Sequence, residues 1–301
     1  MNFRRQYCRD ASLPTGRAQG RRDQARAGAI AALVVSGVAT AQTAPPDQRN
    51  FVACPVVMDT QDAPCWIAEY KGERYFLVVQ TGRGGGGTIK PPELRHKALI
   101  EGTVSNEPRI CGGIVLRPVM ISTLSHDLDN SCNQILPAGG YHTTSVRAIG
   151  LDGDPPAPRL ARTVNARFGA ARGLEERRAL YAANAAAGRA MTFTVHYTFD
   201  STYLMYPDEQ EKVEDAVDYA QLLHASHINV VGYRGQTVLS AGGRLTERGG
   251  LAESRAKQIA DILVNFGWPK DKLSARWVES PENNGGTHDY EQRRMEIVVE
   301  P

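Results

Sequence analysis

The 301-residue sequence lacks the short motifs by which several classes of enzyme are identified. It has no Gly-x-Ser-x-Gly of an α/β-hydrolase, no His-Glu-x-x-His of a zinc protease and no paired-cysteine spacing of a zinc site. The glycine run GRGGGG at residues 82–87 is not followed by the Gly-Lys-Ser/Thr of a phosphate-binding loop, and a flexible hairpin connection explains it better. We therefore expect no metal, no cofactor and no catalytic residues.

A secreted serine hydrolase remains a minor alternative, because a Ser/His/Asp triad has no compulsory linear spacing. The side chains that could form one lie in the first half of the chain: Ser125, His126, Asp127, His142 and Ser145. The seven histidines are scattered along the chain, and a scattered histidine is more often a surface or hydrogen-bonded residue than a ligand.

The apolar run at residues 27–39 (AGAIAALVVSGVA) is too short to cross a bilayer comfortably. It follows a basic leader and precedes Ala39-Thr40-Ala41, which has the A-x-A pattern of a signal-peptide cleavage site. We interpret residues 1–41 as a signal peptide that is cleaved near Ala41. The mature chain is then predicted to have no transmembrane segment and to lie in the periplasm of a Gram-negative cell, with outer-membrane association left open.

The mature chain also lacks a basic charge. The whole sequence has 35 Lys+Arg and 33 Asp+Glu, of which the leader holds seven and two, so 28 basic and 31 acidic residues remain. A net charge of −3 removes the main electrostatic argument for binding nucleic acid.

Few cysteines remain after the leader, but their number is even. Four cysteines in an oxidising compartment predict two disulfides, for which three pairings are possible. Proximity in sequence favours Cys54–Cys65 and Cys111–Cys132. All four lie within residues 48–150, which contain short β-type runs between turn-rich pieces: residues 66–70, 74–79, 98–104 and 113–119. We predict a small disulfide-stapled β domain there, whose function the sequence does not reveal.

Residues 151–189 are rich in Pro, then in Ala and Arg, which predicts a partly helical, loosely docked linker interrupted near Gly169 or Gly173. Residues 190–301 show regular periods instead. The run 191–199 (MTFTVHYTF) alternates strictly as a half-buried strand does, and helical stripes follow at 207–223 and 251–263. Further strands are predicted at 227–233, 273–278 and 294–300. The order strand, helix, strand, helix, strand, strand predicts an α/β sandwich with helices covering one face of a mixed sheet.

Three motifs in this last region resemble those of the OmpA-like peptidoglycan-associated domain. TFDS at 198–201 is similar to the entry motif of that family, and LAESRAKQIADIL at 251–263 to its helix signature, N-x-x-L-S-x-x-R-A-x-x-V-x-x-x-L. QRRMEI at 292–297 is similar to its closing N-R-R-V-E-I. The motifs occur in the family's order, and the resemblance does not extend to residues 42–190.

The resemblance implies a role for Arg255, which lies in the apolar row of its helix between Leu251 and Ile259. In the family this arginine pairs with a carboxylate of the diaminopimelate residue of the peptidoglycan stem. A guanidinium suits the task, because it binds a carboxylate with two N–H groups and keeps its charge. A carboxylate of the protein would neutralise the cation equally well, and a snorkelling arginine is the structural alternative. The candidate ligand-binding residues are Arg255, Asp200, Arg248, Tyr233, Arg293 and Arg294.

The sequence departs from the family at the second strand, which the family follows with G-H-T-D, whose aspartate holds the ammonium group of the ligand. Here residues 232–235 read Gly-Tyr-Arg-Gly, so Gly235 stands where the acid is expected. Arg248 replaces the asparagine of the helix signature, and the loop 235–250 is longer than in the family. Glu247 could serve as a substitute acid. We expect weakened binding, which Gly235→Asp would strengthen if the loop geometry allows it.

The expected function is that of an exported cell-envelope protein, not an enzyme, that binds peptidoglycan non-covalently. The alternative is an OmpA-like scaffold reused in the periplasm to bind an envelope protein.

Overall fold

The structure, a computed structural model, describes residues 44–61, 63–80, 92–124, 128–141, 174–204 and 207–301. The predicted signal peptide, the glycine run, linker residues 151–173 and the hydrolase candidates Ser125, His126, Asp127, His142 and Ser145 lie outside these ranges. Among the described residues, no helix has the length and apolarity that a membrane span requires.

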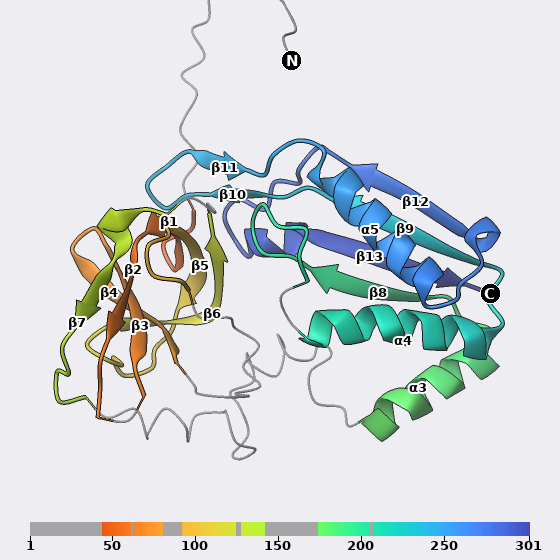
Figure 1. Ribbon diagram of the computed structural model, residues 1–301, viewed down its shortest axis with the longest axis horizontal. Coiled ribbons are helices and arrows are strands. Elements are labelled where there is room, and N and C mark those ends of the chain that lie inside the picture. Colours follow the sequence, from red (N-terminus) through yellow and green to blue (C-terminus); the bar gives the residue numbers. More distant parts are fainter. Residues whose placement is uncertain (1–43, 62, 81–91, 125–127, 142–173, 205–206) are drawn as a thin grey trace, which may run out of the picture. The chain divides into compact units, whose positions relative to one another are not determined.

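The first part of the chain forms a seven-stranded sheet in the order β1-β5-β6-β4-β3-β2-β7 (Figure 1). Its strands are β1 (Gln48–Ala53), β2 (Pro55–Met58), β3 (Cys65–Tyr70), β4 (Glu73–Val79), β5 (Ala98–Val104), β6 (Ile114–Thr123) and β7 (Gln134–Leu136). The pairs β4–β6 and β2–β7 are parallel and the others antiparallel. The four predicted strands are present, whereas β1, β2 and β7 were not predicted.

Two disulfides staple this sheet, as expected, but with a different pairing. Cys54 is bonded to Cys132, and Cys65 to Cys111, so the pairing favoured by proximity in sequence was wrong. The reason is topological. Because β2 pairs with β7, Cys54 at the β1–β2 junction meets Cys132 in the short 3₁₀ helix η1 (Asn130–Cys132) that precedes β7.

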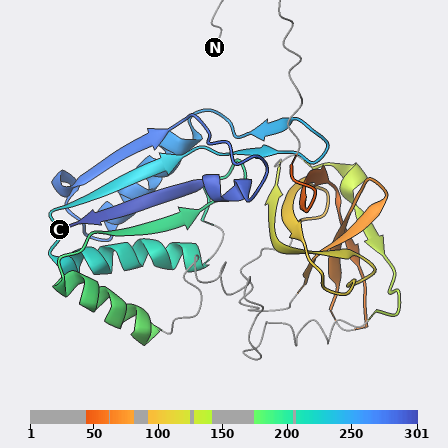
Figure 2. The same ribbon diagram turned by 180° about the vertical axis from the view of Figure 1, so that it is seen from behind.

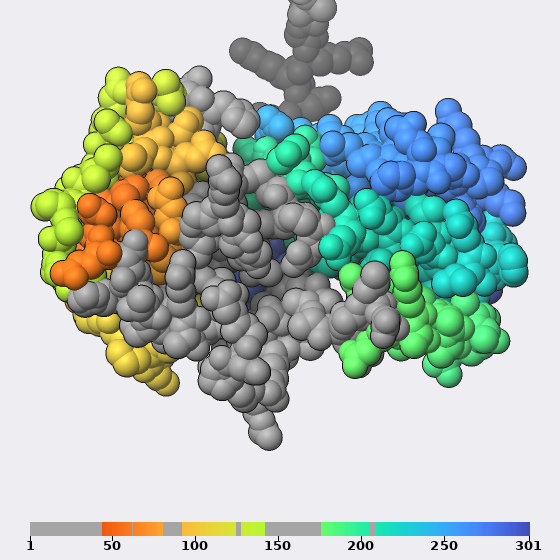
Figure 3. Space-filling model, turned by 60° about the horizontal axis from the view of Figure 1, so that its bottom comes forward, coloured from red at the N-terminus to blue at the C-terminus, as the bar shows by residue number. Residues whose placement is uncertain are grey.

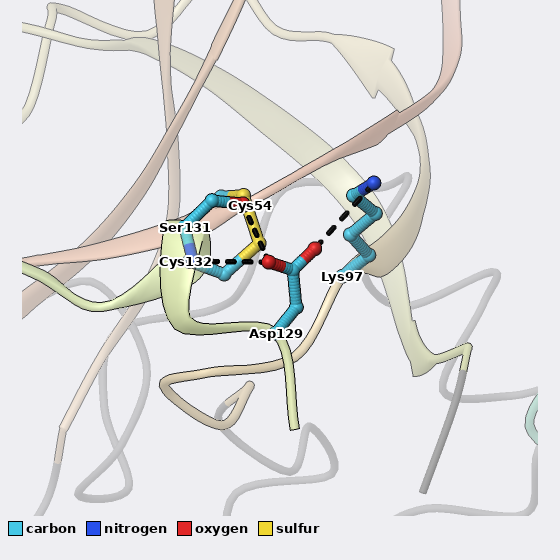
Figure 4. Close-up of a disulfide and its surroundings, with 5 residues drawn as sticks. All are labelled: Cys54, Lys97, Asp129, Ser131 and Cys132. Carbon is cyan, nitrogen blue, oxygen red and sulfur yellow. Dashed lines mark hydrogen bonds and ion pairs between the residues drawn. A yellow bond between two sulfur atoms is a disulfide. The ribbon is translucent and has the colours of Figure 1, made fainter. Parts of the chain in front are cut away.

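The Cys54–Cys132 bond is flanked by a local polar network (Figure 4). Asp129 caps η1 by accepting hydrogen bonds from the backbone N–H and the hydroxyl of Ser131, at 2.9 and 2.6 Å, and Lys97 lies 3.5 Å from its other oxygen. The Ser131 hydroxyl contributes most to lowering the pKa of Asp129, and the Ser131 N–H and Lys97 act in the same direction. The capped turn therefore holds Cys132 in place with a charged carboxylate.

The last part of the chain is the predicted α/β sandwich. Its elements are β8 (Met191–His196), α4 (Pro207–Leu223), β9 (His227–Tyr233), α5 (Leu251–Asn265), η2 (Lys270–Lys272), β12 (Leu273–Val278), η3 (Asp289–Gln292) and β13 (Arg294–Glu300). The sheet has the order β12-β9-β13-β8 and is mixed, because β12 and β9 are parallel whereas β13 runs against both β9 and β8. The order and type of the main elements confirm the sequence-based prediction.

Helices α4 and α5 cover one face of this sheet, as Figures 1 and 2 show from opposite sides. The apolar rows predicted from the sequence meet in one core, which includes Val213, Val217, Ile259, Leu263 and Ile297. The alternating strand ends earlier than predicted: β8 stops at His196, and Ser201 N–H donates to Thr198 O in a turn. Tyr197 and Phe199 nevertheless remain buried, which explains why the alternation continues.

Helix α3 (Leu174–Ala186) packs on α4, and Figure 3 shows the two helices side by side. Its Tyr181 is buried against the rings of Phe193 and Tyr219, and the Tyr181 hydroxyl donates to Asp215 at 2.8 Å. The helix begins after Gly173, but it is not loosely docked as predicted, because one aromatic side chain ties it to the core.

The long loop after β9 contains a hairpin that was not predicted. Strands β10 (Gln236–Val238) and β11 (Arg244–Thr246) pair antiparallel. Each has three residues, too few to produce a periodic pattern.

Candidate functional site

The candidate site lies at the edge of the four-stranded sheet where β8, β9 and β12 have their carboxyl ends, since these three strands run in one direction. Helix α5 also begins here. It approaches β9 so closely that a Cβ on Gly232 would lie 2.2 Å from the carbonyl oxygen of Ala252. This close packing brings the first turns of α5, and with them Arg255, against the end of β9.

Arg255 is completely buried and forms an ion pair with Glu247. The two side chains are 0% exposed, with Nη2 2.6 Å from Oε1 and Nη1 3.0 Å from Oε2. This is the bidentate geometry in which a guanidinium binds a carboxylate. The snorkelling interpretation of Arg255 is therefore wrong, and a carboxylate of the protein itself neutralises the cation.

Backbone groups complete the site on both partners. The Glu247 carboxylate also accepts the N–H groups of Asp200 and Gly235, at 2.9 and 2.7 Å. Arg255 uses its three remaining N–H groups on the carbonyl oxygens of Ser201, Tyr233 and Thr198, at 2.9, 3.3 and 3.5 Å. All five N–H donors of the guanidinium have an acceptor, and four donors converge on one carboxylate.

The environment of the pair explains why both charges must be satisfied. The guanidinium lies 4.6 Å from the centre of the Tyr197 ring, whose pKa is raised, mainly by burial. Removing one member of a buried, hydrogen-bonded pair typically costs about 3–5 kcal/mol, because the other charge remains without compensation. The pair is therefore a strong constraint on the local structure.

Gly235, the departure from the family pattern, lies at the base of the hairpin, directly across from Glu247. Glu247 N–H donates to Gly235 O at 3.1 Å, and Gly235 N–H donates to the Glu247 carboxylate. A Cβ at residue 235 would lie 2.4 Å from Cγ of Arg293. The expectation for Gly235→Asp depended on loop geometry that allows an acid here, and this condition is not met, since the stem of Arg293 occupies the space.

Arg293 is buried as well, and it pairs with Glu101 of β5, a residue 192 positions earlier in the chain. Nη1 lies 3.1 Å from Oε1 of Glu101 and 3.2 Å from Oγ1 of Thr237. Burial alone lowers the pKa of this guanidinium, but the Glu101 carboxylate outweighs burial, so the pKa lies above its usual value. Arg293 therefore stays charged and connects the two sheets.

Tyr233 and Arg294 form a separate surface cluster. Because side chains alternate along β9 and Gly232 faces α5, the Tyr233 ring lies on the opposite face. Arg294 lies 4.1 Å from the centre of that ring and pairs with Glu296 and Glu282 at 2.8 and 3.2 Å. Burial, followed by the hydrogen bond to Glu296, raises the pKa of Tyr233. Their side chains are not part of the Arg255 site.

The other two candidates, Asp200 and Arg248, are joined by one hydrogen bond between a side chain and a backbone N–H. Asp200 has a left-handed backbone (φ 56°), and its carboxylate accepts the N–H of Arg248 at 2.8 Å. The Arg248 side chain is exposed. The structure thus brings Arg255 and Asp200 together around Glu247 and gives Arg248 a backbone contact only. Tyr233 contributes its carbonyl oxygen to the site, whereas the side chains of Tyr233 and Arg294 and the charged group of Arg293 lie elsewhere.

Sequence reasoning missed Glu101. The available signal was a carboxylate inside the apolar run ALIEGTV (98–104), since a charge on a buried strand needs a partner. Among the described residues, no group of three or more His, Cys, Asp and Glu side chains could hold a metal ion.

Comparisons with known proteins return solved structures only: no protein-family model and no curated protein matches the chain. One similar structure is the OmpA-like domain of FopA1 from Francisella tularensis subsp. tularensis SCHU S4, with 19% identity over 37% of this chain and 73% of that one, at a TM-score of 0.30. Another is the periplasmic domain of Helicobacter pylori MotB, with 21% identity over 37% and 74%, at 0.30.

A third similar structure is the cell wall anchor of the T6SS from Pseudomonas aeruginosa, with 17% identity over 40% of this chain and 94% of that one, at a TM-score of 0.29. OmpA-like domains, the family that the three motifs resemble, are thus found again among solved structures. At these identities and scores, the similarity says nothing about the function of this chain.

Proposed function

We propose that the chain is an exported cell-envelope protein whose residues 190–301 associate non-covalently with peptidoglycan through a carboxylate-binding site centred on Arg255. The observation that carries the proposal is the convergence of four donors, two from Arg255 and the N–H groups of Asp200 and Gly235, on a single carboxylate. Peptidoglycan stems present carboxylates, and the three sequence motifs resemble a peptidoglycan-associated family.

The site is closed in this conformation, because the carboxylate it binds belongs to Glu247. A stem carboxylate that uses the same donors has to displace Glu247, whose attachment to the chain gives it a high effective concentration. Wall binding through Arg255 is therefore expected to be weak in the wild type. Glu247 acts as a built-in competitor, and weakening it is expected to strengthen binding.

The test is co-sedimentation of the purified protein with insoluble peptidoglycan. Glu247→Gln keeps the volume of the side chain but removes its charge, so we expect more protein in the pellet than for wild type. Arg255→Ala should abolish binding. Glu253→Gln on the same helix is the matched control, because its pair with Lys257 is exposed and lies outside the site. Circular dichroism of each variant verifies that it is folded.

A second candidate function is favoured by the saturation of the site: every N–H of Arg255 already has an acceptor within the protein. An OmpA-like scaffold with a closed pocket would bind an envelope protein through its surface. If wild type, Glu247→Gln and Arg255→Ala all stay in the supernatant, this second function replaces the first. Release of soluble muropeptides from the wall would indicate a hydrolase instead.

A further inference from the structure

The seven-stranded sheet contacts the β10–β11 hairpin through buried hydrogen bonds. Both lie in one compact unit of the chain, residues 41–301. Asn50 of β1 donates from its side chain to Val238 O of β10 at 3.0 Å and to Gly286 O at 2.7 Å. Its backbone exchanges two hydrogen bonds with Ser240, at 2.9 and 2.8 Å. Asn50 is 1% exposed, so these bonds are shielded from water.

Glu101 of β5 makes the second attachment. Its carboxylate accepts from the hydroxyl of Thr237 in β10 at 2.8 Å and from Arg293. All three side chains are buried. A buried carboxylate in an apolar strand is stable only while such partners are in place, so β5 and the hairpin depend on each other.

The hairpin in turn determines where Glu247 lies. Gly235 immediately precedes β10 and Glu247 immediately follows β11, and the two residues are hydrogen-bonded across the base of the hairpin. Arg293 joins the two sites directly, because its head binds Glu101 while its stem packs against Gly235. A displacement of the hairpin would therefore move Glu247 relative to Arg255.

We propose that strands β1 and β5 act as an intramolecular lock: they hold the hairpin, and through it keep the Glu247 carboxylate in the Arg255 site. Loosening the contacts of Asn50 and Glu101 with the hairpin releases Glu247 more often. The lock itself involves only contacts within the protein and does not depend on any ligand. Its consequence, control of access for a peptidoglycan carboxylate, rests on the proposed function.

The lock is tested by amide hydrogen exchange in the full-length protein, measured at Gly235 and Asp200, whose N–H groups donate to Glu247. Thr237→Val removes the hydrogen bond to Glu101 and the one accepted from Arg293 at nearly constant volume. Each bond lost, worth about 1 kcal/mol, corresponds to roughly 5-fold faster exchange. Asn50→Ala, which removes the side-chain bonds to Val238 O of β10 and to Gly286 O, should also speed exchange at both amides. Amides of α4, such as that of Val217, should change much less.

Thr103→Val is the matched control. Thr103 lies on the same strand as Glu101, but its hydroxyl accepts from Gln48 within the seven-stranded sheet. The lock predicts little change at Gly235 and Asp200 in this variant. Equal exchange in wild type and Thr237→Val, or equal acceleration in Thr237→Val and Thr103→Val, would overturn the lock. If Asn50→Ala fails to fold, the comparison of the two threonine variants decides alone.

The same variants separate the lock from the proposed function. Faster exchange at Gly235 together with increased co-sedimentation supports both. Faster exchange without any wall binding supports the lock and refutes the proposed function. If exchange in Thr237→Val equals that in wild type and the wild type does co-sediment, the lock is refuted and the proposed function stays in place.

Discussion

At the scale of single residues, the Arg255–Glu247 pair can be tested with a small carboxylate. Glu247→Ala removes the equivalent of one acetate molecule and leaves four donors around the gap. We expect acetate to stabilise this variant and so to raise its melting temperature. At a concentration of ten times its Kd, acetate should add about 1.4 kcal/mol to the free energy of unfolding. Acetamide, which is uncharged, should raise it much less, and wild type should not respond to either. Equal effects of acetate and acetamide would contradict a carboxylate site.

Gly235 is expected to tolerate no side chain. Gly235→Ala places a Cβ 2.4 Å from Cγ of Arg293, and forced overpacking of this kind typically costs about 1–3 kcal/mol. Gly249→Ala is the control on the same loop, because its Cβ would meet nothing within 4 Å. Urea denaturation should show a lower midpoint for Gly235→Ala and a nearly unchanged one for Gly249→Ala. A midpoint that is unchanged in both would show that Arg293 moves aside without penalty.

Glu209, near the start of α4, is expected to make stability depend on acid. Burial alone would raise its pKa, but the imidazole of His196, whose Nδ1 lies 3.8 Å from Oε1 of Glu209, and the ammonium of Lys212 at 2.8 Å lower it. A lowered folded-state pKa gives stability that is present above the unfolded value of 4.5 and lost as pH falls through the folded value. Wild type should therefore lose more free energy of unfolding below pH 4.5 than Glu209→Gln does.

Glu214→Gln is the control for this pH dependence, since Glu214 is exposed on the same helix. Its loss of stability between pH 7 and pH 3 should follow that of wild type. The assignment to Glu209 fails if the curves of wild type and Glu209→Gln run parallel.

At the scale of elements, the disulfides give a direct covalent test. Mass spectrometry of a non-reduced digest should find Cys54 linked to Cys132 and Cys65 linked to Cys111. Each closes a long loop, of 78 and 46 residues, for which the chain-entropy model gives about 4 kcal/mol of stabilisation. Finding Cys54–Cys65, or free thiols at these positions, would refute the β2–β7 pairing that brings Cys54 and Cys132 together.

The elements also show what a sequence can predict. Strands β9 and β13 have the predicted bounds, and α5 begins at the predicted residue, because each buries one face and shows a clear period. Strand β12 also has the predicted bounds, although none of its residues is buried. Strands β7, β10 and β11 have three residues each, too few for a periodic pattern of apolar residues. The sequence offered Glu247 as a substitute acid, but its pairing with Arg255, and that of Glu101 with Arg293, could not be predicted. Pairing across 8 and 192 positions depends on how the loops and strands pack.

At the scale of the whole molecule, the boundary of the C-terminal domain is tested with two fragments. The sequence predicts that residues 190–301 fold alone. Because Tyr181 of α3 fills part of that core, we expect fragment 174–301 to be more stable than fragment 190–301. The difference in free energy of unfolding should be at most roughly 3–5 kcal/mol, the typical cost of losing a buried aromatic side chain. Thermal unfolding of both fragments measures the difference. Equal stability would mean that α3 adds nothing.

The position of β13 has a consequence for biosynthesis. This strand comes after all the other described elements in the sequence, yet it lies between β9 and β8 in the interior of its sheet. Arg293 immediately precedes it, so Glu101 lacks this cationic partner until residue 293 has been synthesised. A polypeptide that stops before residue 293 would lack the central strand and leave that carboxylate uncompensated. We therefore expect premature termination to weaken both sheets, because one loses an interior strand and the other retains a buried carboxylate without its cation.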